Sequence, residues 1–477
     1  MASHTESALN KTRPTHKLST AELYDVETSD QDTINRMAEE MALRLAWPRQ
    51  RVLDYQQEHL REILHHAATH SAYYRDTIGH LVESGAPLSD FPVMNKTTLM
   101  SEFDRIVTDP RLTRALVEEH AVTNRAGHLL LDEYRVASTG GSSGQRGVFV
   151  YDREAWDLTV ANLRRMQRLM GLPPALRPVG IAAPSPVHLS NRFYAEMRAM
   201  FPDSPPLSVV TPMEKVVEAL SRYLPDSIST YPSFIRRLAD EQVAGRLKIA
   251  PILMRSVAEA LAPDVRDLVR TTWNIPTTNS YASTEAGIMG SECREQSGIH
   301  LCDDMFLTEI VDDAYRPVSA GTTGAKVLIT TLFNRTLPIV RYELSDYLTA
   351  IDGPCLCGCA FQRIKDIEGR REEMLRVWTP DGREVAVHAP RFWFHLVRVS
   401  GIKQYQFVQL PKGIAIRIVP TVGHNPETVR NEVDRIGRAA LSALDAPEGH
   451  LEVQIVETIE RSGAAAKQKL VASAPAT

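Results

Sequence analysis

One stretch decides how the rest of this chain is interpreted: Ser138-Thr139-Gly140-Gly141-Ser142-Ser143-Gly144-Gln145-Arg146-Gly147. It holds four glycines and four hydroxyl residues, and it has no apolar side chain that could anchor a core. Glycine backbone and hydroxyl groups can surround phosphate oxygens closely. The alternating residues 148–151 predict a strand, and the stretch lacks the Gly-Lys-Ser/Thr ending of a Walker-type loop. Because a flexible surface turn has the same composition, its meaning depends on motifs further along the chain.

The composition is that of a globular chain with more than one domain. Of its 477 residues 43% are hydrophobic and 24% are charged, both ordinary fractions. The net charge is −5 and there is no basic run, which argues against a nucleic-acid partner. No apolar run approaches the roughly 20 residues of a membrane span, and the polar N-terminus does not look like a signal peptide. We therefore expect a cytoplasmic protein without a membrane partner, and a disordered tail over residues 1–20.

Hydrophobic periodicity predicts alternating strands and helices in the first two thirds of the chain. Residues 31–75 are expected to be helical up to Ser71-Ala72-Tyr73-Tyr74-Arg75, and another helix follows the glycine stretch over 154–169. Strands are then expected at 179–183, 207–211, 227–230, 251–255 and 277–281, with helices between them, among them 232–245, 263–272 and one that turns Met213, Val216, Val217 and Leu220 inward. This alternation implies right-handed crossovers and a mostly parallel sheet, whose ligands lie at the carboxyl ends of the strands.

The last third of the chain has a different pattern. Residues 306–348 are rich in strand-forming residues and turns, which predicts a small barrel or an antiparallel sheet. A hairpin at 403–419, a helix at 425–444 and a strand at 451–456 predict a compact α+β unit. The expected fold is α/β, with a large N-terminal domain (21–371) of mostly parallel sheets flanked by helices plus a small β-barrel-like part. A smaller α+β C-terminal domain covers 372–477.

Four further motifs follow the glycine stretch in a definite order: Ser256-Val257-Ala258-Glu259, Tyr281-Ala282-Ser283-Thr284-Glu285, Arg341-Tyr342-Glu343-Leu344-Ser345-Asp346 and Gly369-Arg370-Arg371-Glu372-Glu373. Three of them are placed just after a predicted strand, and each alone is a weak signal. In this order they resemble the adenylate-forming (AMP-forming) ligase superfamily. The helix 60–70 with Ser71–Arg75, the segment Thr230-Tyr231-Pro232-Ser233 and the segment Cys355-Leu356-Cys357-Gly358 are similar to the phenylacetate–CoA ligase family within it. The resemblance covers about residues 55–470.

This resemblance implies an enzyme that activates a small, aromatic carboxylic acid with ATP as an acyl-adenylate. The acyl group would pass to an acceptor, either CoA or an amine, and the setting would be secondary metabolism. Two alternatives stay open: a nitrite-activating, diazo-forming ligase of the same superfamily, and a non-catalytic nucleotide-binding relative. The expected cofactors are ATP, Mg²⁺ and a structural Zn²⁺. The oligomeric state is open, with a homodimer as one option.

The resemblance also implies roles for individual residues. Phosphate contacts are implied for Thr139, Gly140, Gly141, Ser142, Ser143 and Gly144, and other nucleotide contacts for Ala258, Glu259, Tyr281, Ala282, Ser283, Asp346 and Arg370. Tyr281 would lie against adenine, and Asp346 would accept hydrogen bonds from the ribose hydroxyls. Thr284 would hold the α-phosphate and Glu285 the Mg²⁺, an ion that prefers oxygen ligands.

A lysine near the C-terminus is expected to meet the charge that develops at phosphorus. Lys467 is the best match by resemblance, with Lys469 as the alternate. Glu372 is the expected hinge of a mobile small domain. His188, Tyr231 and Pro232 are candidates for the acid pocket, although His188 fits an ordinary loop histidine equally well. His388 and Trp393 are expected to be packing residues.

All five cysteines lie between residues 293 and 359. Cys293 with His300, and Cys355 with Cys357, form two pairs of soft ligands that suit tetrahedral Zn²⁺. Cys359 is a spare or substitute ligand, and a set of buried thiols is the alternative. Such a site would be structural, because four protein ligands leave no position open for a substrate.

Overall fold

The structure is a computed structural model that describes residues 28–123, 127–139, 147–173, 176–370, 374–379, 381–388, 399, 401–442, 446, 449–459 and 471–473. Several predicted positions therefore lie outside the described residues: the tail 1–20, Gly140, Gly141, Ser142, Ser143, Gly144, Glu372, Trp393, Lys467 and Lys469. No helix in the described part of the chain is both long and apolar enough to cross a membrane.

The N-terminal helices are α1 (Gln31–Leu43), the short 3-10 helix η1 (Arg44–Ala46), α2 (Arg49–His70) and α3 (Ala72–Ser84). Helix α2 ends where the sequence predicted, but the prediction that Ser71–Arg75 closes the helical region is wrong. The Ser71 side chain accepts a hydrogen bond from the backbone N–H of Tyr74, so this serine caps the start of α3. A cap residue therefore separates two helices here instead of ending one.

Short elements lead from these helices to the glycine stretch: η2 (Leu88–Asp90), α4 (Lys96–Ser101), α5 (Phe103–Ile106) and α6 (Arg114–His120). Asn95 caps α4, because its side chain accepts a hydrogen bond from the Thr98 N–H. Strands β1 (Arg135–Ser138) and β2 (Val148–Tyr151) pair in antiparallel fashion, and all their residues are buried. The glycine stretch thus connects the two strands of a buried hairpin, which confirms that it leads into a strand.

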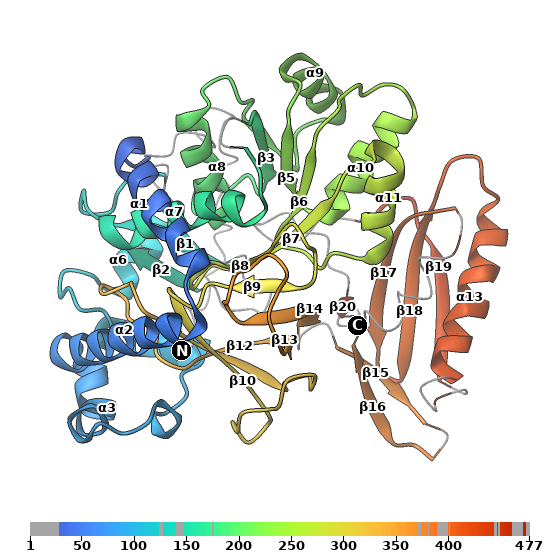
Figure 1. Cartoon of the computed structure of the whole chain (residues 1–477). Helices are drawn as coiled ribbons and strands as arrows, with labels where there is room; N and C mark the ends of the chain where they lie inside the picture. Colours follow the sequence, from blue (N-terminus) through green and yellow to red (C-terminus); the bar gives the residue numbers. More distant parts are fainter. Residues whose placement is uncertain are drawn as a thin grey trace, which may run out of the picture.

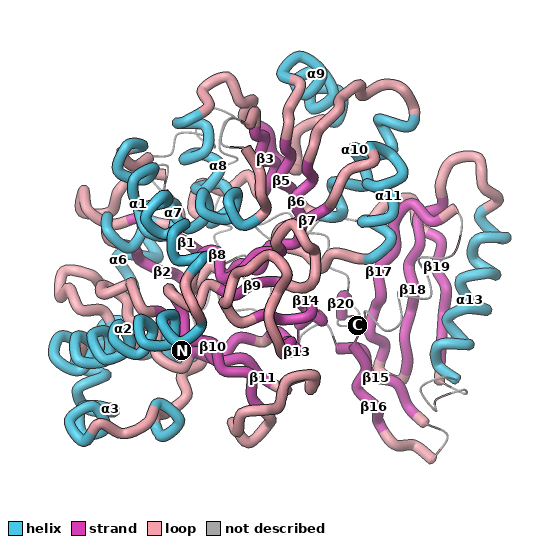
Figure 2. Tube along the Cα trace, viewed as in Figure 1, coloured by secondary structure: helices cyan, strands magenta, loops and turns pink. Residues whose placement is uncertain are grey.

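A nine-stranded sheet forms the centre of the molecule (Figures 1 and 2), in the order β13-β14-β9-β8-β7-β6-β5-β3-β4. Its parallel part contains β3 (Pro178–Ala182), β4 (Leu207–Ser208), β5 (Ser227–Thr230), β6 (Leu253–Ser256) and β7 (Thr277–Ser283). Its antiparallel part adds β8 (Gly287–Glu292), β9 (Ile299–Leu301), β13 (Asp346–Ile351) and β14 (Arg363–Arg370). The predicted parallel strands are confirmed, while the antiparallel extension through β8 and β9 was not foreseen.

Helices cover the parallel strands on both sides (Figure 1): α7 (Arg153–Leu169) and α8 (Leu189–Met200) on one side, and α10 (Pro232–Val243) and α11 (Pro263–Trp273) on the other. Helix α9 (Met213–Tyr223) turns Val216 and Leu220 into the core, as predicted. The fold class predicted from the sequence is confirmed by this arrangement of helices around the sheet.

The expected barrel or antiparallel sheet is a three-stranded antiparallel sheet of β10 (Phe306–Val311), β11 (Lys326–Thr331) and β12 (Tyr342–Leu344). The C-terminal part holds the hairpin β15 (Met374–Trp378) and β16 (Glu384–His388), next to a four-stranded sheet in the order β19-β18-β17-β20. Its elements are β17 (Ile402–Leu410), β18 (Gly413–Pro420), α13 (Pro426–Ser442), β19 (His450–Ile455) and β20 (Val471–Ser473). The predicted 403–419 hairpin, helix and strand are confirmed, whereas the boundary at residue 372 remains a prediction.

A buried ion pair joins α7 to the segment between β9 and β10. Both side chains are fully buried, and the Arg165 guanidinium donates to the two Asp304 oxygens at 2.6 and 2.9 Å. Arg44 adds a third hydrogen bond to Asp304 at 3.0 Å, and the side chain of Asn162 accepts two from Arg165. Burial, the largest single influence, would raise the pKa of Asp304, but the charges and hydrogen bonds of Arg165 and Arg44 together hold that pKa below its usual value.

We predict that Arg165→Met destabilises the protein by about 3–5 kcal/mol, because it leaves a buried carboxylate without its main partner. Urea denaturation followed by circular dichroism measures the loss. Arg270→Met is the matched control, since Arg270 pairs with Asp267 in an exposed position and such pairs contribute about 0–1 kcal/mol. An equally small loss of unfolding free energy in both variants would show that the buried pair does not stabilise the protein more than an exposed pair.

Candidate functional site

The carboxyl ends of the parallel strands meet at one edge of the sheet. Strands β3, β5 and β6 end at Ala182, Thr230 and Ser256, and the residues that follow bond across the strands. The hydroxyl of Tyr231 accepts a hydrogen bond from the Ala183 N–H at 3.1 Å. The Val257 N–H donates to the Thr230 carbonyl at 3.1 Å. Motifs that lie far apart in the sequence are therefore held at one edge, where ligands of such sheets bind.

Three residues predicted to bind the nucleotide lie together. The Tyr281 hydroxyl donates a hydrogen bond of 2.9 Å to the Asp346 carboxylate, and both side chains are more than nine-tenths buried. Asp346 pairs with Arg370 across strands β13 and β14, so the backbone of Arg370 is its direct neighbour. One hydrogen bond thus joins Tyr281 and Asp346, which are 65 residues apart in the sequence.

Thr284 and Glu285 lie in the turn between β7 and β8. The Tyr151 hydroxyl donates to the Thr284 carbonyl at 2.7 Å, and the Tyr342 hydroxyl donates to Glu285 Oε1 at 3.4 Å. The expectation that the motif follows the strand is wrong for its first three residues, which lie inside β7 because they pair with β8. The half-buried Thr284 and Glu285 stand at the turn, where a ligand can reach them.

The base of the glycine stretch is tied to its surroundings at Thr139. The hydroxyl of this residue accepts hydrogen bonds from the Gly147 N–H at 2.8 Å and from the Lys96 ammonium at 3.2 Å. The Ser138 N–H donates to the carbonyl of Val187 at 2.9 Å, which brings the His188 turn beside the same base. The start of the phosphate-binding segment proposed from the sequence therefore carries a cation, and it adjoins the predicted acid pocket.

The Ser256–Glu259 motif makes a tight turn at the end of β6. Ala258 has a φ of 67°, in the left-handed region that a side chain makes unfavourable. The Glu259 carboxylate accepts a hydrogen bond from the Ser233 N–H at the start of α10. A carboxylate in this position stabilises the helix start, a role that the sequence did not predict for Glu259. Strained turns of this kind are frequent at functional sites.

The three residues proposed for the acid pocket lie at two neighbouring strand ends. Tyr231 is fully buried, and Pro232 is the first residue of α10. His188 is 8% exposed at the start of α8, and its Nδ1 lies 2.9 Å from the Ser190 hydroxyl. Burial raises the pKa of Tyr231 above its usual value, with the Glu259 charge as the next cause. Tyr231 therefore enters the site as a neutral hydrogen-bonding group.

The four predicted metal ligands converge. The ligand atoms of Cys293, His300, Cys355 and Cys357 all lie within 4.8 Å of one another. Cys293 Sγ is 3.7 Å from Cys355 Sγ, and Cys357 Sγ is 3.5 Å from His300 Nε2. Cys359 is buried in the core beside this group and is not one of its members. Four soft donors at these separations fit one tetrahedral zinc ion.

Arg363 holds the segments that carry these ligands. Its guanidinium donates to the carbonyls of Ser297, Gly353 and Pro354, on both sides of the cluster. Its strand position pairs it with His300 across β14 and β9. Burial, followed by the Arg363 charge, lowers the pKa of His300 to about 4, so the imidazole is neutral at neutral pH.

Three side chains of the site escaped the sequence reasoning: Lys96, Tyr151 and Tyr342. None of them had a role assigned from the sequence, although Tyr151 stands in a predicted strand and Tyr342 in one of the quoted motifs. Their proximity to Thr139, Thr284 and Glu285 results from contacts between residues far apart in the sequence. No local pattern marks a residue for such a role.

Comparison with known proteins agrees with this geometry. No family model matches the chain. It is 29% identical to a phenylacetate-coenzyme A ligase of Thermus thermophilus over 169 residues, which cover 34% of this chain and 38% of that protein. Protein CapK of Staphylococcus aureus is 19% identical over 313 residues, or 62% of each chain. The matched segment thus spans 38% to 62% of the length of these relatives.

Solved structures match over a greater length. A 2-hydroxyisobutyryl-CoA ligase in its postadenylation state covers 91% of both chains with a TM-score of 0.71 and 18% identity. The same ligase in its thioesterification state covers 90% of this chain with a TM-score of 0.57 and 18% identity. The fold is therefore that of the adenylate-forming ligases. Within this class, the curated relatives include phenylacetate-coenzyme A ligases, which confirms the resemblance predicted from the sequence.

We predict that Ala258→Gly stabilises the protein by about 0.5–1 kcal/mol. Glycine removes a left-handed strain of about 1–2 kcal/mol and adds a smaller entropy cost in the unfolded chain. Ala439→Gly in the exposed face of α13 is the control, and it should cost about 1 kcal/mol. Thermal melting of both variants measures the difference. A loss of stability at both positions would show that the turn at Ala258 carries no relievable strain.

Proposed function

We propose that this protein activates a small carboxylic acid with ATP and transfers the acyl group to CoA or an amine. An oxygen of the acid attacks the α-phosphorus, and the bond to the bridging oxygen of pyrophosphate breaks. The acceptor thiol or amine then attacks the acyl carbon, and AMP leaves. An aromatic acid is the expected substrate class.

The Tyr281–Asp346 pair is the observation that carries this proposal. A buried carboxylate in this position can accept hydrogen bonds from the paired hydroxyls of a ribose, and the Tyr281 ring offers a neighbouring face to adenine. Arg370 lies directly across the strand pair from Asp346. Thr284 and Glu285 follow Tyr281 by three and four residues, which suits contacts to the α-phosphate and to Mg²⁺.

The phosphate end of the nucleotide would lie against the glycine stretch. Lys96 meets the Thr139 hydroxyl at 3.2 Å, so its ammonium is placed to balance the charge of the leaving pyrophosphate. This position adds a cation to the residues that the sequence proposed. It also provides positive charge at the site independently of Lys467.

We further propose that residues 372–477 form a mobile domain that brings Lys467 to the site for the first step only. Support comes from the greater similarity to the postadenylation state than to the thioesterification state of the same ligase, with TM-scores of 0.71 and 0.57. Glu372 is the proposed hinge between the two parts.

We expect ATP–pyrophosphate exchange with at least one acid of an aromatic panel. Lys467→Ala should lower this exchange by about 10²–10³-fold, the effect of removing one group that stabilises charge in the transition state. Lys469→Ala is the matched control and should exchange normally. Glu372→Pro should spare exchange and impair acyl transfer to the acceptor. If Lys469→Ala alone lost exchange, the catalytic lysine would be Lys469 and not Lys467. If the unmodified protein showed no exchange with any acid, the non-catalytic alternative would be favoured.

We also propose that Cys293, His300, Cys355 and Cys357 bind one structural Zn²⁺. The convergence of the four ligand atoms supports this assignment, because Cys293 and Cys357 are 64 residues apart in the sequence. A bound ion would join these segments through four bonds, and binding energy of this kind contributes directly to folding.

Elemental analysis should find close to one zinc per chain, and strong chelation should lower the melting temperature. Cys355→Ser should reduce the zinc content, because it removes one of four ligands. Cys359→Ser is the control and should retain zinc, since Cys359 lies outside the group of ligands. Metal-free protein that melts at the same temperature as untreated protein would refute the site.

A further inference from the structure

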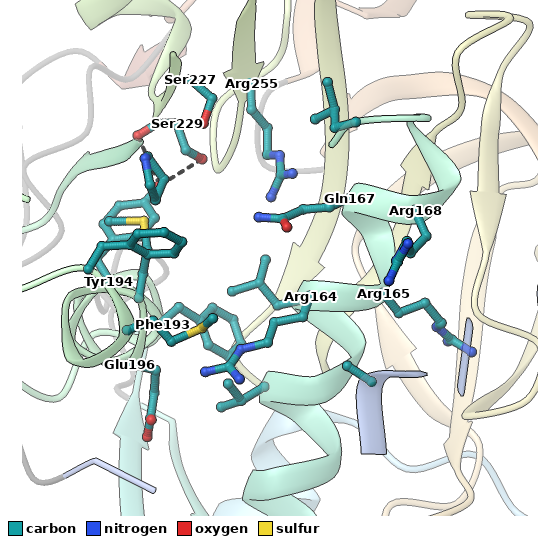
Figure 3. A pocket seen from close by; sticks show the side chains of 18 of the residues that line it. Arg164, Arg165, Gln167, Arg168, Phe193, Tyr194, Glu196, Ser227, Ser229 and Arg255 are labelled. Carbon is teal, nitrogen blue, oxygen red and sulfur yellow. Dashed lines mark hydrogen bonds between the residues drawn. The ribbon is translucent and has the colours of Figure 1, made fainter. Parts of the chain in front are cut away.

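A cavity lies away from the predicted nucleotide contacts. Its volume is about 170 Å³, and residues of α1, α7, α8, β3, β5 and β6 line it. Figure 3 shows part of this lining. Most of its walls are apolar, among them Val160, Phe193 and Met197. None of the residues proposed above for ATP or for zinc lines it. An engineered apolar cavity of about 150 Å³ binds benzene, so the space suits a body the size of one ring.

The two carboxylates at the cavity wall already have partners. Glu196 accepts hydrogen bonds from the Trp156 indole at 2.8 Å and from the Ser29 N–H at 3.0 Å. Glu39 forms an ion pair with Arg168. Neither carboxylate is a partner of Arg255, the remaining cation of the wall.

Two further arginines at the wall are also occupied. Arg165 points away from the cavity (Figure 3) and is paired with Asp304. Arg164 donates to the Asn35 side-chain oxygen at 2.7 Å. Burial lowers the pKa of Arg164 to about 10, and the nearby Glu196 opposes that shift. Of the arginines that line the cavity, only Arg255 has not yet been given a partner.

Arg255 of β6 is that guanidinium. Among the described residues it has no carboxylate partner; it donates to the Met170 sulfur at 3.8 Å, and the Tyr194 hydroxyl lies near enough to act on its charge. Its Nε is buried without any acceptor. Burial lowers the pKa of Arg255, the direction expected when a cation lacks a counter-charge. The Arg255 side chain is half-buried and has no carboxylate partner in the described part of the chain, and an anion in the cavity would supply the missing counter-charge.

Gln167 of α7 faces Arg255 across the cavity. Figure 3 shows both side chains pointing into the same space. The Gln167 amide makes no hydrogen bond to the part of the chain that the structure describes, and it offers two N–H donors. One wall thus contributes a guanidinium and the opposite wall an amide.

We propose that this cavity binds the carboxylate of a small organic acid, with Arg255 as its counter-charge and Gln167 as a second donor. The flat guanidinium matches a carboxylate with two parallel hydrogen bonds. The apolar walls favour an organic body such as a ring or a branched chain over inorganic phosphate. The inference does not rest on the proposed function, because carboxylate binding is measured without ATP.

The cavity adjoins the predicted acid pocket through Tyr194. Its hydroxyl donates to Ser229 at the cavity wall, and its ring lies so close to β3 that a Cβ at Gly180 would approach it to 2.2 Å. Arg255 directly precedes the Ser256–Glu259 motif in the sequence. The carboxylate bound here can belong to either of two molecules. It is the distal carboxylate of the acid that is activated, or it belongs to a second acid molecule.

Calorimetric titration of the whole protein with acetate, isobutyrate and benzoate tests the proposal. Benzoate should bind, and Arg255→Met should weaken that binding by about 10- to 100-fold, the value of a charge-assisted contact. Gln167→Leu, which leaves the arginine in place, should weaken it less. Arg168→Met is the matched control, because that arginine is exposed and paired with Glu39.

Melting temperatures guard against misfolded variants. Without ligand, Arg255→Met should melt at a higher temperature than the unmodified protein, because it lacks the unpaired charge. Benzoate should raise the melting temperature of the unmodified protein but not that of Arg255→Met. Destabilisation of Arg255→Met without ligand would overturn the proposal, since it would show that the arginine has a partner within the protein. So would the absence of binding by all three acids, or equal benzoate affinity in Arg255→Met and Arg168→Met.

Pyrophosphate exchange distinguishes the two sources of the carboxylate. If the distal end of the substrate binds here, Arg255→Met should shift acid preference from dicarboxylates to monocarboxylates. If a second acid binds here, preference stays unchanged, and the variant no longer responds to added benzoate. Both outcomes support the site, and they identify what fills it.

Discussion

The Arg165–Asp304 ion pair is the contact on which the surrounding architecture depends. It joins α7 to the segment after β9, and Arg44 connects the same carboxylate to the N-terminal helices. Because both charges are fully buried, separating them leaves a desolvated group without compensation. The pair and Arg44 therefore hold helix α7, the segment after β9 and the N-terminal helices in one relative position.

The candidate site depends on a second constraint, the shared direction of the parallel strands. Strands that run together end at one edge, so the polar residues that follow them are gathered without being adjacent in sequence. The antiparallel hairpin of β7 and β8 extends this edge and turns Thr284 and Glu285 toward Tyr151 and Tyr342. The motifs therefore lie at the carboxyl ends of the parallel strands, and the antiparallel strands β7 and β8 position the turn that carries Thr284 and Glu285 among them.

Polar groups in the interior differ in whether they are satisfied. Arg165 and Glu196 have several partners each, whereas Arg255 faces a cavity and has no carboxylate partner among the described residues. The Cys/His cluster is a related case, in which soft ligands converge and Arg363 fastens the segments around them. In both places the protein has brought together groups that are costly to bury alone, and the proposed ligand and the proposed ion would offset that cost.

The sequence by itself determined the α/β class, most of the parallel strands, the C-terminal hairpin with its helix, and the four Cys/His ligands. These features follow from short-range periodicity and from motif order, which a linear chain displays directly. Only the tertiary structure decided that β8, β9, β13 and β14 join the same sheet, and that Lys96 meets Thr139. It also decided that Glu259 caps a helix and that Arg255 lies unpaired in a cavity. Such facts depend on which distant residues meet and which partners burial leaves available, and neither is encoded in a local pattern.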